Sequence, residues 1–364
     1  DSKPTIENCT FTGNITKNGN GGAVAGDEAS PAITSCTFNS NQASAGSGGA
    51  ISFNESQSDI IRLSTFTGNI AKEGGAVYVY QAKNGQFLQC RFENNNGDYG
   101  GGIYLEGSGK EANPILFTNC IFWHNEADYG GGAILGTKSD NLYSYLKLDH
   151  CTLTGNKTNE GGVSEGGGAH ISIGSKLTVL NSLLWNNTAD EYQEIYSLFT
   201  AYVTVNYSDV KGGWEGEGNI DANPLFTDPE NGDFTLMEGS PCIDAGTVIE
   251  DMEYCGEAPD MGAYEYCEEL SAASAAPLSY HIQPAYPNPF NPVTSISYSL
   301  PENGNVELIV YNIQGRQLHT LVNKFQTAGY HSINWNASSY PSGVYLIRMT
   351  SGEFSQTQKV VLVK

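Results

Sequence analysis

Cys36-Thr37-Phe38-Asn39-Ser40-Asn41 is one copy of a pattern that occurs seven times in the first half of the chain. Each copy opens with Cys or Ser, has Phe or Leu two residues later, and has Asn five residues after the opener. Successive openers are 27, 28, 26, 30, 31 and 31 residues apart. A repeat of this length is one supersecondary unit that must stack on its neighbours to bury its apolar side chains. The asparagines of the column are Asn14, Asn41, Asn69, Asn95, Asn125, Asn156 and Asn187.

A second pattern alternates with the first and consists of Gly-Gly, a small residue and a branched apolar residue, as in Gly74-Gly75-Ala76-Val77. Because Gly and Asn interrupt the chain every few residues, short strands and tight turns are favoured over helical repeats. The units are therefore predicted to be turns of a parallel β-solenoid, stacked at about 4.8 Å per turn. Phe should stack on Phe and Cys on Cys inside. The Asn column should mark a corner, where the amide bonds the next turn and the backbone is left-handed.

These two motifs resemble the polymorphic outer-membrane protein type of right-handed parallel β-helix repeat, over about residues 5–190. The resemblance implies the fold and its handedness but no particular activity. Three later blocks resemble the closing segment of bacterial surface β-helix proteins, and we expect them to form a cap over the open end of the core. The blocks are Asn223-Pro224-Leu225-Phe226, Ser240-Pro241-Cys242-Ile243-Asp244-Ala245-Gly246 and Asp260-Met261-Gly262-Ala263-Tyr264-Glu265-Tyr266.

The last 80 residues differ from the repeats, because alternating strands such as 306–311 and 344–349 predict a small antiparallel β-sandwich. Its motifs resemble the type A C-terminal sorting domain of the type IX secretion system of Bacteroidetes-like bacteria. They are Tyr286-Pro287-Asn288-Pro289-Phe290-Asn291-Pro292, then Gly343 and Tyr345, and the terminal Lys364. The resemblance implies the type IX machinery as a partner, export through the periplasm, and a place outside the cell or on the outer-membrane surface.

An all-β chain of four parts is therefore predicted. They are the β-helix repeats at 1–204, a last turn and cap at 205–267, a linker at 268–283 and the sorting domain at 284–364. Since the chain enters a repeat directly after Asp1, we expect a cap and an export signal to precede it. No stretch approaches 18 apolar residues, so no transmembrane segment is expected.

Charge is unevenly distributed along the chain. Residues 277–364 hold three acidic and five basic residues, so 37 acidic and 12 basic residues precede them. Such an acidic rod should repel nucleic acid, and we expect no nucleic-acid partner. Five of the eight cysteines are repeat openers and are predicted to pack as small apolar side chains. Of Cys242, Cys255 and Cys267, two can pair in an oxidising compartment.

Polysaccharide lyases and polygalacturonases also use parallel β-helices, so a polysaccharide lyase or glycoside hydrolase is the alternative function. The catalytic candidates are Asp98, Asp128, Arg62 and Arg91. Asp98 and Asp128 recur in Asp-Tyr-Gly-Gly-Gly one turn apart, where they could share a Ca²⁺ ion. The simpler interpretation is that each Asp caps an exposed Gly-rich turn, with no cofactor.

The strand after the Gly-Gly pair should carry an outward column with aromatic residues at Tyr78, Tyr104 and His170. Tyr80 and Glu106 should lie two residues further along on the same face. Tyrosine rings at steps of about 4.8 Å on a flat sheet can stack on sugar rings, although aromatics also suit exposed strands without a ligand. Insertions at 137–146 and 157–166 add loops of the kind that often form binding faces. The sequence therefore predicts an exported, non-catalytic binding or adhesion rod for extracellular polysaccharide or cell-surface glycans. A structural stalk is the third possibility.

Overall fold

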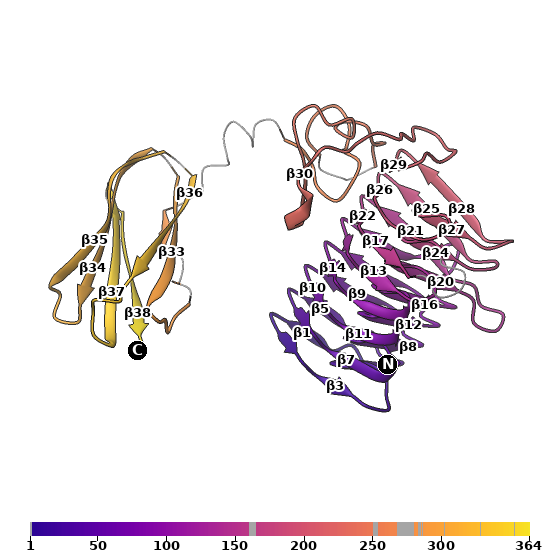
Figure 1. The fold of residues 1–364 in the computed structure, drawn as a ribbon, viewed down its shortest axis with the longest axis horizontal. Helices are drawn as coiled ribbons and strands as arrows, with labels where there is room; N and C mark the ends of the chain where they lie inside the picture. The colour runs from indigo at the N-terminus through magenta and orange to yellow at the C-terminus, as the bar shows by residue number, and fades with distance from the viewer. Residues whose placement is uncertain are drawn as a thin grey trace. The chain divides into compact units, whose positions relative to one another are not determined.

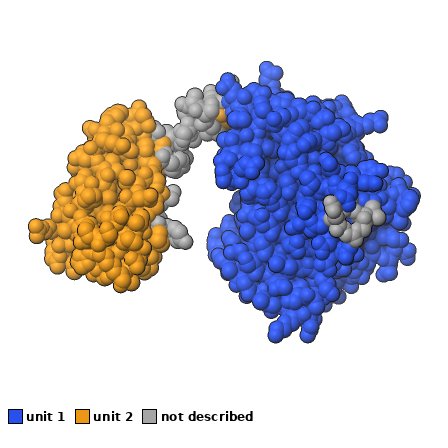
Figure 2. All heavy atoms as spheres, viewed as in Figure 1, with its two compact units in different colours: residues 1–266 blue, residues 267–364 orange. Residues whose placement is uncertain are grey.

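The computed structural model describes residues 2–159, 165–249, 254–267, 280–282, 285, 287–301, 303–327, 329–352 and 354–364. The chain forms two compact units, residues 1–266 and 267–364 (Figures 1 and 2). Within the described residues, no helix has the length and apolar character needed to cross a bilayer. The predicted all-β fold is confirmed: the first unit is a parallel solenoid of about seven turns, and the second consists of small antiparallel sheets.

Each complete turn of the solenoid contributes one short strand to each of four parallel sheets, which we name A to D in chain order (Figure 1). Sheet A contains β1 (Thr5–Glu7), β5 (Ala32–Thr34), β9 (Asp59–Arg62), β13 (Gly85–Leu88), β17 (Ile115–Thr118), β21 (Tyr145–Asp149), β25 (Lys176–Leu180) and β28 (Tyr202–Asn206). Sheet B contains β2 (Thr10–Thr12), β6 (Thr37–Asn39), β10 (Thr65–Thr67), β14 (Arg91–Glu93), β18 (Ile121–Trp123), β22 (Thr152–Thr154), β26 (Leu183–Trp185) and β29 (Asp209–Val210).

After its strands in sheets A and B, the chain of each complete turn passes through sheet C and then sheet D. Sheet C contains β3 (Ile15–Thr16), β7 (Gln42–Ser47), β11 (Ile70–Glu73), β15 (Asn96–Tyr99), β19 (Glu126–Ala127) and β23 (Lys157–Thr158). Sheet D contains β4 (Val24–Asp27), β8 (Ile51–Asn54), β12 (Val77–Tyr80), β16 (Ile103–Glu106), β20 (Ile134–Thr137), β24 (Ala169–Ile171) and β27 (Ile195–Ser197).

Identical residues stack in the core because the strands pair in register, for example Phe38 with Phe66 and Phe66 with Phe92. The ring centroids of successive phenylalanines are 4.7 to 4.9 Å apart from Phe11 to Phe122, and the rings are nearly parallel. The opener column is buried beside them from Cys36 to Ser182, whereas Cys9 in the first turn is exposed. The thiols of the column are free, as is that of Cys242, whereas Cys255 and Cys267 are disulfide-bonded.

The asparagine column forms a continuous hydrogen-bonded ladder at the corner between sheets B and C. The side-chain amide of Asn95 donates to Asn125 Oδ1 (2.8 Å) and to the carbonyl of Phe66 (2.9 Å). Its own Oδ1 accepts from the backbone N–H and the side-chain amide of Asn69. The ladder ends where Asn187 donates to the buried carboxyl of Glu194 (2.5 Å).

One detail of this corner differs from the sequence-based expectation. The left-handed residue is the one before each asparagine, and it is Gly, Ser, Asn or His, with φ between 52° and 65°. The seven asparagines themselves do not have positive φ. The reason is geometric: the residue before the asparagine makes the bend, which leaves the amide directed into the corner to meet the next turn.

The segment that was expected to cap the open end of the core also covers part of the outer face of sheet B. Trp214 packs on the last turn of the core. The described residues 221–249 and 254–266 then lie against the outer face of sheet B, where Phe226, Phe234 and Met261 form an apolar cluster with Ile121 and other residues. This flanking segment contains β30 (Phe226–Asp228), the 3₁₀ helix η1 (Pro229–Asn231) and β31 (Asp233–Leu236). Apolar outward residues on sheet B, such as Ile121 and Leu183, explain why the segment lies there.

The second unit is built from two antiparallel sheets. One contains β32 (His281–Ile282), β33 (Val293–Leu300) and β36 (Gly329–Asn336), and the other contains β34 (Gly304–Asn312), β35 (Gln317–Gln326), β37 (Gly343–Ser351) and β38 (Phe354–Leu362). Trp335 lies fully buried in their core.

The opening motif of this unit is fastened to its last strand. Asn288 exchanges two side-chain hydrogen bonds with the backbone of β38, at Lys359 O and Val361 N. Phe290 is buried against Trp335. Tyr286, which belongs to the same motif, lies outside the described residues. These contacts connect the opening motif of the unit to its last strand.

Candidate ligand-binding site

The four residues considered as catalytic candidates do not converge. Arg62 is exposed at the end of a sheet A strand, Arg91 lies in sheet B, and Asp98 lies in sheet C. Arg91 forms an ion pair with Glu93 (2.6 Å), donates to the carbonyl of Gly232 (3.2 Å) and lies over the Trp123 ring. Arg91 therefore attaches the flanking segment to the solenoid and is not free to act as a base.

Asp98 and Asp128 lie on adjacent turns of the sheet C edge. Partial burial and then the charge of Asp128 raise the pKa of Asp98, while Lys72 lowers it. The Asp128 carboxylate accepts a hydrogen bond from Asn159 (3.3 Å). Within the described ranges, no group of three or more His, Cys, Asp or Glu side chains lies close enough to hold a metal ion. The pair alone offers at most four carboxylate oxygens, whereas Ca²⁺ takes six to eight oxygen ligands.

The aromatic column on the outer face of sheet D is more buried than a flat stacking face would be. Tyr78 is only 7% exposed, because its hydroxyl donates to Glu106 (2.6 Å) and its ring packs edge-on against Tyr104. Burial raises the pKa of Tyr104 to about 12, although Thr137 donates to its hydroxyl (3.1 Å) and lowers that pKa. Tyr78 therefore does not offer an exposed ring, because it packs against Tyr104 and Glu106, and sugar binding by this column stays a prediction.

His170 belongs to the same face but lies two turns beyond Tyr104. Its ring packs edge-on against Tyr196, and burial lowers its pKa to about 4. The imidazole is therefore neutral at neutral pH. The structure brings together Tyr78, Tyr80, Tyr104 and Glu106 and leaves His170 apart from them.

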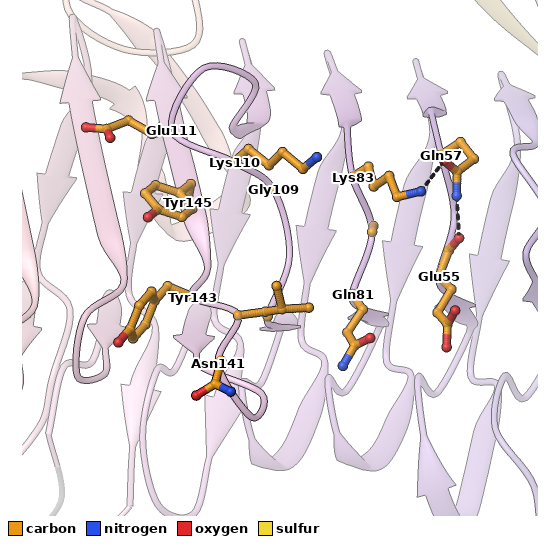
Figure 3. A pocket seen from close by; sticks show the side chains of 13 residues that line it. Glu55, Gln57, Gln81, Lys83, Gly109, Lys110, Glu111, Asn141, Tyr143 and Tyr145 are labelled. Carbon is orange, nitrogen blue, oxygen red and sulfur yellow. Dashed lines mark hydrogen bonds between the residues drawn. The ribbon is translucent and has the colours of Figure 1, made fainter.

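Tyr80, at the end of this column, contacts Gln81, which lines a pocket at the corner between sheets D and A. Its hydroxyl accepts from Gln81 Nε2 (2.9 Å) and from Ser139 Oγ (3.4 Å). The pocket beside Gln81 has a volume of about 440 Å³ (Figure 3). Its walls come from four consecutive turns, at Glu55 and Gln57, at 81–83, at 107–111 and at 141–145.

The pocket exists because the loops between sheets D and A lengthen along the solenoid. The loop after β20 forms a small hairpin, in which Ser139 and Leu142 exchange backbone hydrogen bonds of 2.8 Å. The loop after β16 is closed in the same way by Lys110 and Asn113. Behind these loops the fully buried Ser108, Ser144 and Ser175 connect successive turns, with each hydroxyl accepting from the backbone of the preceding turn.

The lining combines aromatic, amide and charged groups. Leu142 and Tyr143 are 49% and 40% exposed, and the Tyr143 ring packs on Gly174, where a Cβ atom would lie 2.3 Å from the ring. Lys83 donates to Gln57 Oε1 (2.8 Å), and Glu111 pairs with Lys176 (3.2 Å). The insertion at 137–146 was the only sequence signal for this pocket. Gln81, Lys83 and Lys110 occupy loop positions that no repeat motif marks.

Comparison with known proteins agrees with the architecture. Residues 1–145 match the family model described as right handed beta helix region, and residues 284–364 match that of the secretion system C-terminal sorting domain. The sorting domain indicates export to the cell surface or the extracellular space, with the type IX secretion machinery as a partner. No curated protein matches the chain.

One similar solved structure is the crystal structure of pectate lyase Pel9A. It is 17% identical, and the alignment covers 70% of this chain and 72% of that chain with a TM-score of 0.30. A likeness this weak carries no argument about activity.

Proposed function

We propose that this exported β-helix protein binds a glycan outside the cell, and that the pocket at the corner between sheets D and A is its binding site. The observation that carries the proposal is the pocket itself, a concave space of about 440 Å³ beside exposed aromatic and amide side chains. Pockets that bind small ligands fall in the same range of volume. A sugar ring can place its apolar face on Tyr143, while Gln81 and Asn141 exchange hydrogen bonds with its hydroxyls.

Two features favour binding over hydrolysis. The carboxylates that line the pocket are Glu55 and Glu111, which lie at opposite ends of it in Figure 3. They belong to turns two apart, so about 10 Å separates them along the axis, which exceeds the separation used by glycosidases. Glu111 is also held by Lys176. The arrangement offers a surface for recognition rather than an acid and a base on either side of one bond.

The test measures retention of the full chain on immobilised neutral and acidic polysaccharides, together with Tyr143→Ala and Gln81→Ala. We expect retention on at least one polymer and a loss of about fivefold in affinity for each variant, because each removes a contact of the order of 1 kcal/mol. Tyr99→Ala is the matched control, since Tyr99 is an equally exposed tyrosine (42%) on sheet C.

Enzymatic activity is measured on the same panel, with and without Ca²⁺, by the absorbance of unsaturated uronates and by reducing ends. Release of either product would contradict a purely binding role. Unchanged affinity in both pocket variants would place the glycan elsewhere on the solenoid.

A further inference from the structure

The charge of the pocket differs from that of the solenoid around it. Before residue 277 acidic residues outnumber basic residues by 37 to 12. The pocket wall, in contrast, carries two lysines, Lys83 and Lys110, and two glutamates, Glu55 and Glu111. Because Lys176 already pairs with Glu111, the pocket has more positive charge available to a ligand than negative charge. An anionic group would be repelled by most of this protein but not here.

The two lysines also differ from others of the solenoid in their partners. Lys147, Lys157 and Lys176 each pair with a carboxylate, at 2.7, 3.7 and 3.2 Å. Lys83 donates to the neutral amide of Gln57 instead. The ammonium of Lys110 has no hydrogen bond or ion pair with any residue that the structure describes, although its backbone is fixed by the bridge to Asn113.

The charged side chains of the pocket also differ in the direction in which they point. In Figure 3 the side chain of Lys110 extends along the pocket toward Lys83, and Glu111 points the opposite way. The Gln57 amide that accepts from Lys83 also donates to the carbonyl of Glu55 (3.0 Å), so the Lys83 ammonium is held at one end. Tyr143 and Tyr145 lie toward the other end of the same pocket.

We infer that the pocket recognises an acidic sugar unit of an anionic glycan, with its carboxylate or sulfate group between Lys83 and Lys110 and its ring against Tyr143. This inference rests on the proposed function and specifies the class of glycan. An ammonium is a compact point charge that suits either anion, and a charge-assisted hydrogen bond is about twice as strong as a neutral one. Uronate and sulfate esters share this chemistry, and the experiment separates them.

The experiment uses the full chain in affinity electrophoresis against three soluble polymers: polygalacturonate, dextran sulfate and unmodified dextran. The variant is Lys83→Met with Lys110→Met, which removes both charges and keeps the length of both side chains. Lys17→Met/Lys72→Met is the matched control, because it removes two lysine charges from the first and third turns without touching the pocket.

We expect at least one anionic polymer to bind more tightly than dextran and to lose affinity with rising salt. The Lys83→Met/Lys110→Met protein should lose at least tenfold in affinity for that polymer and should show a flatter salt dependence, while the control keeps both. The polymer that responds identifies the anion as carboxylate or sulfate.

Two results would overturn the inference while leaving the proposed function in place. One is binding of dextran as tight as that of both anionic polymers, with no effect of the pocket lysines. The other is an equal loss in the Lys17→Met/Lys72→Met control, which would indicate general charge attraction. If the protein bound none of the three polymers and no other glycan of the wider panel, the proposed function itself would be contradicted.

Discussion

At the scale of single residues, the asparagine ladder is the most informative feature. Asn95 is fully buried, and its amide takes part in four hydrogen bonds that connect three successive turns. A buried polar group that loses its partner costs about 1–3 kcal/mol. The ladder therefore makes the register of each turn depend on its neighbours.

Replacing Asn95 by Ala should lower the free energy of unfolding of the solenoid by about 2–4 kcal/mol, because amide and carbonyl groups on both neighbouring turns lose partners. Chemical denaturation monitored by circular dichroism measures the change. Asn96→Ala is the control in the same turn, since Asn96 is only half-buried, and it should change stability by less than about 1 kcal/mol. Equal effects of the two variants would contradict a ladder that holds the turns in register.

Two buried carboxyl groups predict how stability depends on pH. Burial raises the pKa of Asp59 to about 7 and that of Glu194, at the end of the ladder, to about 7. Both groups bind a proton more tightly in the folded than in the unfolded chain. Their contribution is therefore complete below about pH 4 and is lost as the pH rises through about 7.

The melting temperature should accordingly fall between pH 5 and pH 8, and Asp59→Asn with Glu194→Gln should reduce that fall. Each group accounts for a few kcal/mol at most. Differential scanning calorimetry of both proteins at the two pH values gives the answer. A fall of the same size in the double variant would show that other groups set the pH dependence.

At the scale of elements, the flanking segment behaves as an additional layer on sheet B. Phe234 is 2% exposed and packs edge-on against Trp123 and Phe226, with the Arg91 guanidinium over its ring. This layer is apolar where it meets β18 and β26, and it is joined to the solenoid by hydrogen bonds from Gly262 to Asn181 and from Ala263 to Thr152. It shields part of one solenoid face.

Phe234→Ala should detach this layer while the solenoid stays folded. Truncating a buried Phe costs about 3–5 kcal/mol, and the loss falls on contacts between the layer and sheet B. Hydrogen exchange followed by mass spectrometry should show faster exchange in peptides from 221–249 and no change in sheets C and D. The exposed Met237 (44%) supplies the control variant Met237→Ala. Unaltered exchange in 221–249 would contradict the layered arrangement.

Elements also show what the sequence can and cannot predict. The spacing from Phe38 to Phe66 was sufficient to predict stacked turns, because a parallel in-register solenoid places like residues above each other. Phe234 has no such repeated partner, so its position on sheet B does not follow from periodicity. The burial of Tyr78 depends on Glu106 one turn away, and the pocket depends on loops of unequal length. These contacts do not recur from turn to turn, so the repeat pattern of the sequence cannot predict them.

At the scale of the whole molecule, our proposal assigns binding to the first unit, and the sorting-domain match assigns export to the second. The solenoid carries the pocket, and residues 284–364 match the sorting domain. The second unit has its own core around Trp335. A chain that is exported by one unit and binds through the other should allow the two activities to be separated by deletion.

Deletion of residues 284–364 should abolish delivery to the cell surface or medium in a host with the type IX machinery, and should leave glycan retention of the purified protein unchanged. Cell fractionation and affinity electrophoresis measure the two effects. A reporter that carries an N-terminal export signal and is fused to residues 267–364 is the matched control and should be exported. A reporter that stays inside the cell would show that the solenoid contributes to export.

The central claim is that the corner between sheets D and A is the glycan-binding site, and ligand-dependent hydrogen exchange tests it most directly. The full chain is compared with and without a saturating oligosaccharide taken from the polymer that retains it. We expect protection in peptides that cover 55–57, 81–83, 107–111 and 139–145, and none in the first turn. Protection confined to the sheet C and D faces around Tyr99 and Tyr104, with these loops unchanged, would contradict the account.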